Sequence, residues 1–295
     1  MEEFASKKVF IFLATLVVFN ILAWAVVFDL SQQKFMEVNF FDVGQGDAIF
    51  IETPKGQQVL IDGGPSSAIL EKLGKEIPFW DREIDLVILS HPEADHLVGL
   101  LEVLKKYKVR NILWTGIVRD TPEYVEWQKL IKEERAKIYI AKKEERILMS
   151  NGILIDILYP LQNLEGKEIK DSNDTSVVGR LAFGDNSFLF TGDATQLAEK
   201  EIIREYSCSN SCEFATLDSD VLKVAHHGSK TSSSSEFLEE VSPEVAVISV
   251  GENNSYGHPT SETLENLNKY GIKVLRTDER GDIKIVSDGE AIKVE

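Results

Sequence analysis

The sequence predicts a four-layer α/β sandwich, two mixed sheets packed face to face with helices outside, preceded by one N-terminal transmembrane helix. In each half of the chain, closely spaced strand patterns come first and an alternation of helices and strands follows. An uncharged apolar run, VFIFLATLVVFNILAWAVVF, occupies residues 9–28. The 295 residues are enough for one large domain with an ample core.

The apolar run is about as long as a bilayer is thick and has no polar face, so a buried core helix is disfavoured. Lys7 and Lys8 precede it, whereas only Asp29 and Lys34 stand close after it. The excess of positive charge before the run places residues 1–8 in the cytoplasm and the rest of the chain outside.

A cleaved export signal is the competing interpretation, because AWA at residues 23–25 resembles a signal-peptidase site. The protein would then be secreted. The apolar run continues past that site, which favours an uncleaved single-pass anchor over residues 9–28. Residues 29–35 are then a linker, and residues 36–295 form the folded domain.

The first half of the folded domain alternates hydrophobic strand patterns with amphipathic helices. Its expected strands lie at residues 37–43, 47–53, 57–63, 84–90 and 111–116, followed by a hairpin over 145–160 that turns at Asn151-Gly152. Its expected helices lie at residues 66–75, 96–107 and 123–136.

The second half repeats this order without repeating the sequence. Its expected strands lie at residues 176–184, 186–192, 220–226, 244–250 and 272–278. Its expected helices lie at residues 195–206, 234–241 and 260–271. Two such halves are what a four-layer sandwich requires.

The chain is acidic: 32 Lys and Arg stand against 49 Asp and Glu, a formal charge of −17. Such a surface repels polyanions at long range, so a nucleic-acid substrate needs a local basic groove. The densest basic group, Lys105, Lys106, Lys108 and Arg110, has the pattern of a solvated helix end. The sequence therefore indicates no such groove.

Cys208 and Cys212 are the two cysteines, in the segment CSNSC. They lack the second pair or nearby His that a metal site needs. Two unrelated buried thiols are the alternative, but a Ser/Asn-rich loop is untypical of a core. A small loop disulfide is favoured, in agreement with export.

All five histidines fall in three short loops that follow strands: His91 and His96, His226 and His227, and His258. Strand-terminal loops are where α/β folds carry their functional sites. Histidines distributed as ordinary core or surface residues would not cluster in this way. The clustering predicts a metal site.

Carboxylates accompany these histidines. Glu93 and Asp95 stand between His91 and His96, and Asp193 follows the strand SFLFTG. Imidazole and carboxylate suit two divalent cations in one pocket, bridged by Asp193 about 3.5–4 Å apart. Singly, Asp95 and Asp193 are as well explained as helix caps, but capping leaves the imidazoles unexplained.

The segment SHPEADH resembles the H-x-H-x-D-H signature of the metallo-β-lactamase superfamily. FDVGQGDA, LIDGG, NDTSVV, FTGDA, LKVAHHGSKTSSS and VISVGENNSYGHP together resemble the metallohydrolase domain of the ComEC competence family. The motifs occur in the expected order from residue 40 to the C-terminus. The resemblance implies a dinuclear metal hydrolase on an αβ/βα sandwich.

The resemblance also implies a ligand set. One cation would take His91, Glu93 and the bridging Asp193. The other would take Asp95, His96, Asp193 and one histidine of the HHGS turn, for which His227 is preferred over His226. His226 would then support the ligands or face the substrate.

Two positions depart from the superfamily pattern. Glu93 stands where the signature has its second histidine, and Asn173 and Asp174 stand where the middle motif has one. The first cation site is therefore rich in oxygen, which favours Mn²⁺ alongside Zn²⁺ or leaves that site weakly occupied. The chain also lacks the polytopic channel of a full ComEC protein, so DNA transport is not implied.

Several neighbouring residues are expected to support the reaction. Asp95 and Asp193 would orient the attacking hydroxide, and His258 would donate a proton to the leaving oxygen; a loop histidine bonded to backbone carbonyls is the alternative. The residues expected to support the ligands or contact the substrate are Asp42, Gln45, Asp47, Asp62, Asn173 and Asp174. Ser229 and Lys230 would hold a phosphate, although a Ser-rich helix start looks the same.

The sequence thus predicts a membrane-anchored phosphodiesterase or nuclease acting outside the cytoplasm. By resemblance, its substrate is DNA and its role is competence-type DNA processing with a separate uptake machinery. The alternatives are hydrolysis of a cell-wall or phosphocholine ester, and an anchored binding module that has lost a metal.

Overall fold

The computed structural model describes residues 2–31, 35–206 and 216–295. The chain divides into two compact units, Met1–Lys34 and Phe35–Glu295, which are described separately here. Cys208 and Cys212 lie outside the described residues, so the expected disulfide stays a prediction.

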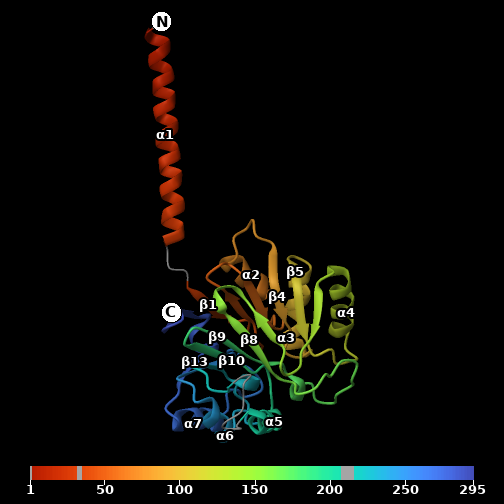
Figure 1. Cartoon of the computed structure of the whole chain (residues 1–295). Coiled ribbons are helices and arrows are strands. Elements are labelled where there is room, and N and C mark those ends of the chain that lie inside the picture. The colour runs from red at the N-terminus through yellow and green to blue at the C-terminus, as the bar shows by residue number, and fades with distance from the viewer. Residues whose placement is uncertain (1, 32–34, 207–215) are drawn as a thin grey trace. The chain divides into compact units, whose positions relative to one another are not determined.

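The first unit is one helix, α1 (Glu2–Ser31), shown in Figure 1. Its segment Lys7–Val27 is long and apolar enough to cross a membrane, and none of it is buried. Helices of this kind serve either as membrane anchors or as signal sequences, which are the two alternatives that the sequence left open.

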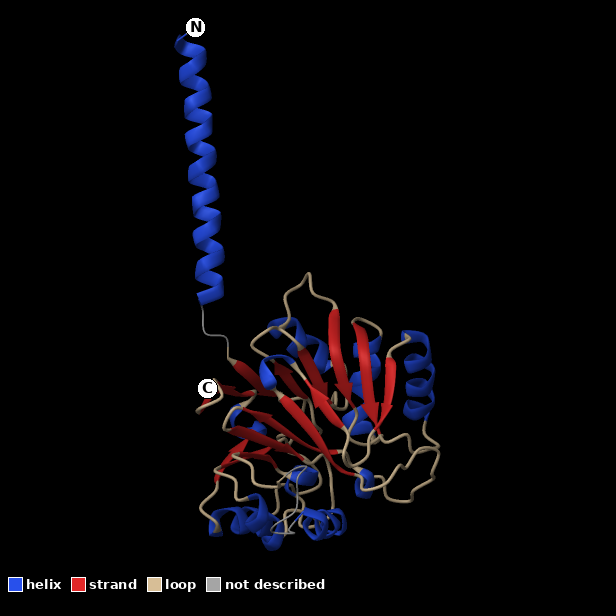
Figure 2. Ribbon diagram, viewed as in Figure 1, coloured by secondary structure: helices blue, strands red, loops and turns tan. Residues whose placement is uncertain are grey.

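The second unit contains two mixed sheets (Figure 2). The first sheet has eight strands in the order β15-β14-β1-β2-β3-β4-β5-β6. They are β1 (Met36–Phe40), β2 (Ile49–Glu52), β3 (Gln58–Ile61), β4 (Glu83–Ile88), β5 (Lys108–Trp114), β6 (Lys137–Ile140), β14 (Ile283–Ser287) and β15 (Ile292–Val294). Strands β3 to β6 are parallel, whereas β14 returns from the C-terminal part of the chain to pair antiparallel with β1.

The second sheet has seven strands in the order β13-β12-β11-β10-β9-β8-β7. They are β7 (Arg146–Leu148), β8 (Leu154–Tyr159), β9 (Val178–Phe183), β10 (Asn186–Phe190), β11 (Val221–Lys223), β12 (Val245–Ile248) and β13 (Lys273–Arg276). Strands β10 to β13 are parallel. In both sheets the parallel strands end in the loops that carry the histidines.

Helices cover the outer face of each sheet. They are α2 (Ala68–Glu76), α3 (Ala94–Leu104), α4 (Pro122–Glu134), α5 (Gln196–Tyr206), α6 (Ser235–Val241), α7 (Ser261–Lys269) and α8 (Thr277–Arg280), with short 3-10 turns η1 (Ser150–Gly152), η2 (Asn173–Thr175) and η3 (Ala225–Gly228). Thr121, Ser234 and Thr260 cap α4, α6 and α7 by accepting backbone N–H bonds.

Three apolar cores separate these four layers. The central core lies between the sheets, where Val38 and Phe40 of β1 alternate inward and Phe40 meets Phe190 at a ring-centroid distance of 6.3 Å. A second core, including Trp127, packs α2, α3 and α4 on the first sheet, and a third, including Phe237, packs α5, α6 and α7 on the other.

The predicted four-layer sandwich is therefore confirmed. Each expected strand and helix occurs within a few residues of its predicted position. Strands β6, β14 and β15 and the one-turn helix α8 were not predicted. β6 and β15 lie at sheet edges and α8 is one turn long, whereas β14 lies inside the sheet and its alternating pattern was a usable signal.

Candidate metal centre

Loops from both sheets meet at the candidate site. β4 ends at Ile88 and leads through Ser90 and His91 into α3, whose first turn carries Asp95 and His96. β10 leads to Asp193, and β11 leads to the histidines of η3. Because parallel strands end on the same side of a sheet, the fold collects these side chains at one place.

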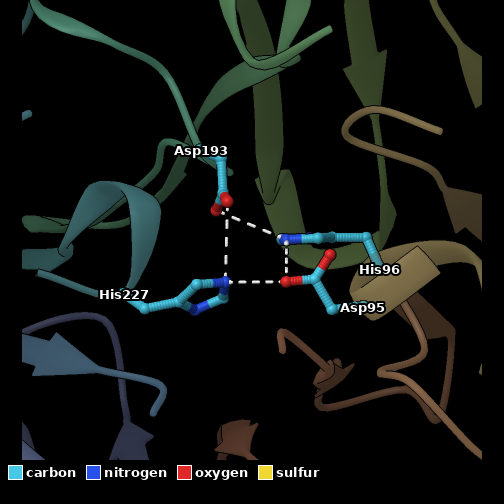
Figure 3. A group of neighbouring side chains, drawn as sticks. All are labelled: Asp95, His96, Asp193 and His227. Atoms are coloured by element: carbon cyan, nitrogen blue, oxygen red, sulfur yellow. Dashed lines mark hydrogen bonds and ion pairs between the residues drawn. The ribbon is translucent and has the colours of Figure 1, made fainter. Parts of the chain in front are cut away.

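Four side chains point toward one another in Figure 3: Asp95, His96, Asp193 and His227. His96 Nε2 lies 3.3 Å from Asp193 Oδ1 and 3.9 Å from Asp95 Oδ2. His227 Nε2 lies 3.3 Å from Asp95 Oδ2 and 3.5 Å from Asp193 Oδ2. Each residue thus offers one ligand atom, and all four atoms lie within 4.8 Å of one another.

The backbone around this cluster is built for close approach. His226 and His227 both take left-handed conformations, with φ of 50° and 52°, so two consecutive imidazoles leave one short turn. Gly46 packs against the backbone of Asp95, where an added Cβ would lie 2.2 Å from the Asp95 carbonyl oxygen. The DVGQGDA loop therefore needs glycine at residue 46 in order to lie against the loop of residues 91–96, which is called the metal loop here.

The Nδ1 atoms of the two central histidines are already bonded elsewhere. His96 Nδ1 lies 2.8 Å from Asp62 Oδ2, and Asp62 also accepts hydrogen bonds from the backbone N–H and the hydroxyl of Ser90. His227 Nδ1 lies 2.8 Å from the carbonyl oxygen of Ser249. An Nδ1–H that donates in this way directs the Nε2 lone pair of each ring into the cluster, as in known metal sites.

A buried charge pair lies beneath the cluster. Lys223 and Asp47 are fully buried and contact each other, and Lys223 Nζ also donates to the carbonyl oxygen of Gly192 at 3.1 Å. Lys223 Nζ lies 4.0 Å from Asp193 Oδ1. Burial opposes ionisation of Asp47, but Lys223, His227 and His96 together outweigh it and lower the pKa of that carboxyl. The pair holds Asp47 ionised beside both central histidines.

Without a cation the cluster holds protons. Burial would lower the pKa of His227, but Asp193 and Asp47 raise it to about 10. Burial likewise opposes protonation of His96, yet Asp193 and Asp62 raise its pKa well above 6.5. The two imidazolium charges hold the pKa of Asp193 well below its usual value against the effect of burial.

His91 is different. Its ring lies against that of His96 at a centroid distance of 4.2 Å, and burial together with the His96 charge lowers its pKa to about 3. Its Nδ1 lies 3.0 Å from the Ser90 hydroxyl. Its buried Nε2 has no hydrogen-bond partner among the described residues. His91 is thus a neutral imidazole with a free Nε2 beside the cluster.

Glu93 lines the same cleft but is bonded outside the four-residue cluster. Its Oε1 accepts a hydrogen bond from Arg119 Nη2 at 2.6 Å and another from the Ser172 hydroxyl. Arg119 Nη1 also donates to the carbonyl oxygen of Ile169 at 3.3 Å. Glu93 therefore ties the loop before η2 to the loop that carries His91 and Asp95, and both of these bonds use Oε1.

A cleft of about 220 Å³ opens over the cluster. Three of the clustered residues, Asp95, Asp193 and His227, line it. The other lining residues are Gln45, His91, Glu93, Lys170, Asp171, Ser172, Asn173, His226, Tyr256 and His258. His226 Nε2 lies 3.8 Å from Asp193 Oδ2 and 3.5 Å from Asn173 Nδ2. Buried His258 Nδ1 has no hydrogen-bond partner among the described residues, so backbone carbonyls do not satisfy this ring.

Six expected supporting residues do not line this cleft: Asp42, Asp47, Asp62, Asp174, Ser229 and Lys230. Asp47 and Asp62 are buried and bond the clustered histidines. Asp42 accepts the backbone N–H of Gly44 within its own turn. Asp174 bonds Thr195, Ser229 bonds Thr231, and the side chain of Lys230 is exposed. Ser229 is the C-cap residue of η3 and α6 begins only at Ser235, so the phosphate-binding role of Ser229 and Lys230 stays a prediction.

Sequence reasoning missed Lys223, Arg119 and Ser172. Lys223 carried a usable signal, because it stands inside the apolar strand segment VLKV, where a lysine is rarely buried without a carboxylate partner. Arg119 and Ser172 carried none, since both belong to loops whose meeting at Glu93 depends on the tertiary fold.

The donor set fits a divalent cation. The Nε2 atom of His91 is buried and unpartnered, and those of His96 and His227 face two carboxylates while their Nδ1 atoms are bonded elsewhere. Imidazole nitrogen and carboxylate oxygen are the ligands of hydrolytic Zn²⁺ and Mn²⁺ sites. The cluster is consistent with metal binding, and it leaves the identity of the metal open.

The fold and the cluster together define a metallohydrolase, and residues 41–252 match the model of the Metallo-beta-lactamase superfamily. The chain belongs to this superfamily. It is a domain related to competence proteins: 32% identical over 265 residues to ComE operon protein 3 of Bacillus subtilis (strain 168), and 33% identical over 248 residues to Competence protein ComA of Neisseria gonorrhoeae. Each match covers 84% of this chain, which spans about a third (32%) of each relative.

Solved structures share the fold. The metallo-beta-lactamase fold protein YhfI from Bacillus subtilis matches with a TM-score of 0.56 and 14% identity, over 86% of this chain and 100% of its own. Igni18, a metallo hydrolase from Ignicoccus hospitalis KIN4/I, matches with a TM-score of 0.53 and 17% identity, over 85% and 98%. At these identities the likeness concerns the fold alone.

Proposed function

We propose that this protein is a metal-dependent phosphodiesterase that cleaves DNA outside the cytoplasm with two divalent cations, Zn²⁺ or Mn²⁺. The observation that carries the proposal is the convergence of Asp95, His96, Asp193 and His227 beneath an open cleft. The relationship to competence proteins supports DNA as the substrate.

We assign the ligands to two groups. Asp95, His96, Asp193 and His227, whose ligand atoms lie close together, would hold one cation. His91, Glu93 and the shared Asp193 would hold the other. Cations bound there supply Lewis-acid activation of water and of the phosphoryl oxygen.

The chain's own residues then position and protonate the reactants. Asp62 and the Ser249 carbonyl fix the tautomers of His96 and His227. Asp95 and Asp193 accept hydrogen bonds and so orient the attacking water. His258, whose imidazole lines the cleft, donates a proton to the leaving oxygen, which an alkoxide requires.

The anchor interpretation of α1 places this chemistry on the outer face of the membrane, with the N-terminus inside. The relationship to competence proteins supports a DNA-uptake machinery as the source of the substrate strand. Labelling of cysteines introduced at Lys230 and at Glu3 with a membrane-impermeant maleimide, in intact cells, tests this. We expect only the Lys230 site to react.

The full-length chain, freed of metal and reloaded with Mn²⁺ or Zn²⁺, tests the proposed activity. Release of nucleotides from single-stranded DNA is expected with one of these metals and not with the Asp193→Asn variant. An intact strand under both metals, with two cations bound per chain, contradicts the DNA proposal. One bound cation and no hydrolysis would favour an anchored binding module.

A second candidate is hydrolysis of a cell-wall or phosphocholine phosphodiester. The acidity of the chain favours it, because a formal charge of −17 repels a long polyanion. Turnover of bis(p-nitrophenyl) phosphate without cleavage of DNA would support this candidate.

A further inference from the structure

Tyr256 is an exposed aromatic residue at the mouth of the candidate cleft. Its side chain is 70% exposed and belongs to the cleft lining together with His258 and Asp193. The Tyr256 and His258 rings lie 5.9 Å apart between centroids, at an angle of 34°. A single exposed aromatic residue is ordinary, so its significance depends on how its loop is held.

The loop that carries Tyr256 is braced from within. Asn254 Oδ1 accepts the backbone N–H groups of Tyr256 and His258, at 3.2 and 3.1 Å. Asn254 Nδ2 donates to the carbonyl oxygens of Gly251 and His258, at 3.1 and 2.7 Å. One side-chain amide thus makes four hydrogen bonds across a short loop.

The same loop is also tied to the metal loops. Gln45 Oε1 accepts the backbone N–H of Gly251 at 3.2 Å, and Gly228 of the HHGS turn packs against Pro259, which an added Cβ would approach to 2.6 Å. The Tyr256 ring is therefore presented to solvent from a support that also positions the ligands. Little conformational entropy is left to lose when a ligand binds it.

The charges of the cleft lining bear on what the Tyr256 ring can bind. The carboxylates of the cleft lining are Glu93, Asp95, Asp171 and Asp193; Arg119 pairs with Glu93, and the proposed cations would neutralise Asp95 and Asp193. Lys170 is the one lysine in the lining, and it forms no ion pair with any described residue. Beyond the cations, the cleft therefore offers few positive charges to the rest of a phosphodiester chain, and stacking on an aromatic face supplies an attraction that does not depend on charge.

We infer that Tyr256 is a stacking site for a nucleobase next to the scissile phosphate, which makes single-stranded nucleic acid the substrate class of the cleft. The inference rests on the proposed phosphodiesterase function. Every base has a π face, so Tyr256 accepts any sequence, whereas a polyol phosphate offers no such face. Duplex DNA keeps its bases stacked inside and cannot offer one to the ring.

Cleavage of dinucleotides tests this site in the metal-loaded, full-length protein. The substrates are TpT and its two analogues that lack the base on one side or the other of the phosphate. In Tyr256→Ala, the ratio of kcat/KM for TpT to that for one abasic analogue is expected to fall about tenfold, mainly through KM. Tyr256→Phe, which keeps the ring, should hold the ratio within about twofold of the wild-type value. Trp80→Ala, an exposed aromatic outside the cleft lining, is the matched control.

Binding separates this inference from the proposed function. Fluorescence anisotropy compares a labelled thymidine octamer with an abasic octamer on the same variants. If the wild type cleaves TpT but Tyr256→Ala leaves both ratios unchanged, the stacking site is overturned and the phosphodiesterase stands. If no dinucleotide is cleaved, yet the thymidine octamer binds in a Tyr256-dependent way, the stacking site stands and the nuclease does not. If the protein shows no cleavage and no Tyr256-dependent binding, both the stacking site and the phosphodiesterase are overturned.

Discussion

His227 Nε2 lies 3.3 Å from Asp95 Oδ2, although 132 positions separate the two residues along the chain. The contact joins the first sheet, whose strand β4 leads into α3, to the second sheet, whose strand β11 leads into η3. A single cation held between them would therefore connect the two halves of the sandwich as well as serve the reaction.

Replacement of His227 by Ala removes one of the four clustered ligand atoms. We expect the dissociation constant for the tightest Zn²⁺ to rise by more than about 100-fold, beyond the 10- to 100-fold cost of losing a residue that only supports a ligand. Competition with a fluorescent chelator measures this. His258→Ala, a cleft histidine outside the cluster, is the control, and equal affinities for the two variants would show that His227 is not a ligand.

Metal binding is expected to release protons. In the cation-free cluster, Asp193 and the neighbouring carboxylates raise the pKa of His227 to about 10 and that of His96 well above 6.5, so both rings are protonated at pH 7. Each must lose a proton to bind a cation, and affinity therefore rises with pH, by about one logarithmic unit per pH unit for each proton released. His91, with a pKa near 3, contributes none.

Calorimetry in buffers of different ionisation enthalpy counts these protons. When its metal site is filled at pH 7, the wild type is expected to release about two protons per chain. Asp62→Asn weakens the support for protonated His96 and should lower that number. A binding heat that is independent of the buffer would contradict the expected proton release.

The Glu93→Gln variant tests whether Glu93 is a ligand of the second cation. Because Glu93 is bonded to Arg119 and Ser172, the second cation is expected to bind more weakly than the first, and the variant should keep one cation per chain. Metal analysis after gel filtration in a low concentration of free Mn²⁺ gives the stoichiometry. Glu168→Gln, an exposed substitution on a neighbouring loop, should behave as the wild type. Two tightly held cations in Glu93→Gln would exclude Glu93 as a ligand.

Lys223→Met leaves the Asp47 carboxylate buried without its main partner. Removing one member of a buried ion pair costs about 3–5 kcal/mol, so the free energy of unfolding of the metal-free protein should fall by about that amount. Urea denaturation followed by the fluorescence of buried Trp114 and Trp127 reports it. Lys230→Met, at an exposed lysine that follows η3, should change it by less than about 0.5 kcal/mol. A loss below about 1 kcal/mol in Lys223→Met would argue against the buried pair.

His258→Gln tests the proton donor through the leaving group. An alkoxide needs a proton, so kcat for a dinucleotide should fall by about 10²–10⁴-fold. p-Nitrophenolate leaves without one, so kcat for bis(p-nitrophenyl) phosphate should change far less. Equal losses on both substrates would assign His258 to binding rather than to proton transfer.

The sequence by itself determined the layers and the positions of the histidines. Alternating strands such as β1 and amphipathic helices such as α4 are set by local hydrophobic patterns, which do not depend on distant residues. The clustering of all five histidines after strands already indicated a metal site, since strand ends of one sheet share an edge.

Only the tertiary structure decided which polar groups pair. Glu93 lies between His91 and His96 in sequence, yet it bonds Arg119 and Ser172, and Lys223 is buried against Asp47 rather than solvated. These partners lie 26, 79 and 176 positions apart in the chain (223 minus 47 for the last pair), so no local pattern joins them. Charge pairing depends on distances of a few ångströms and on burial, and folding alone sets both.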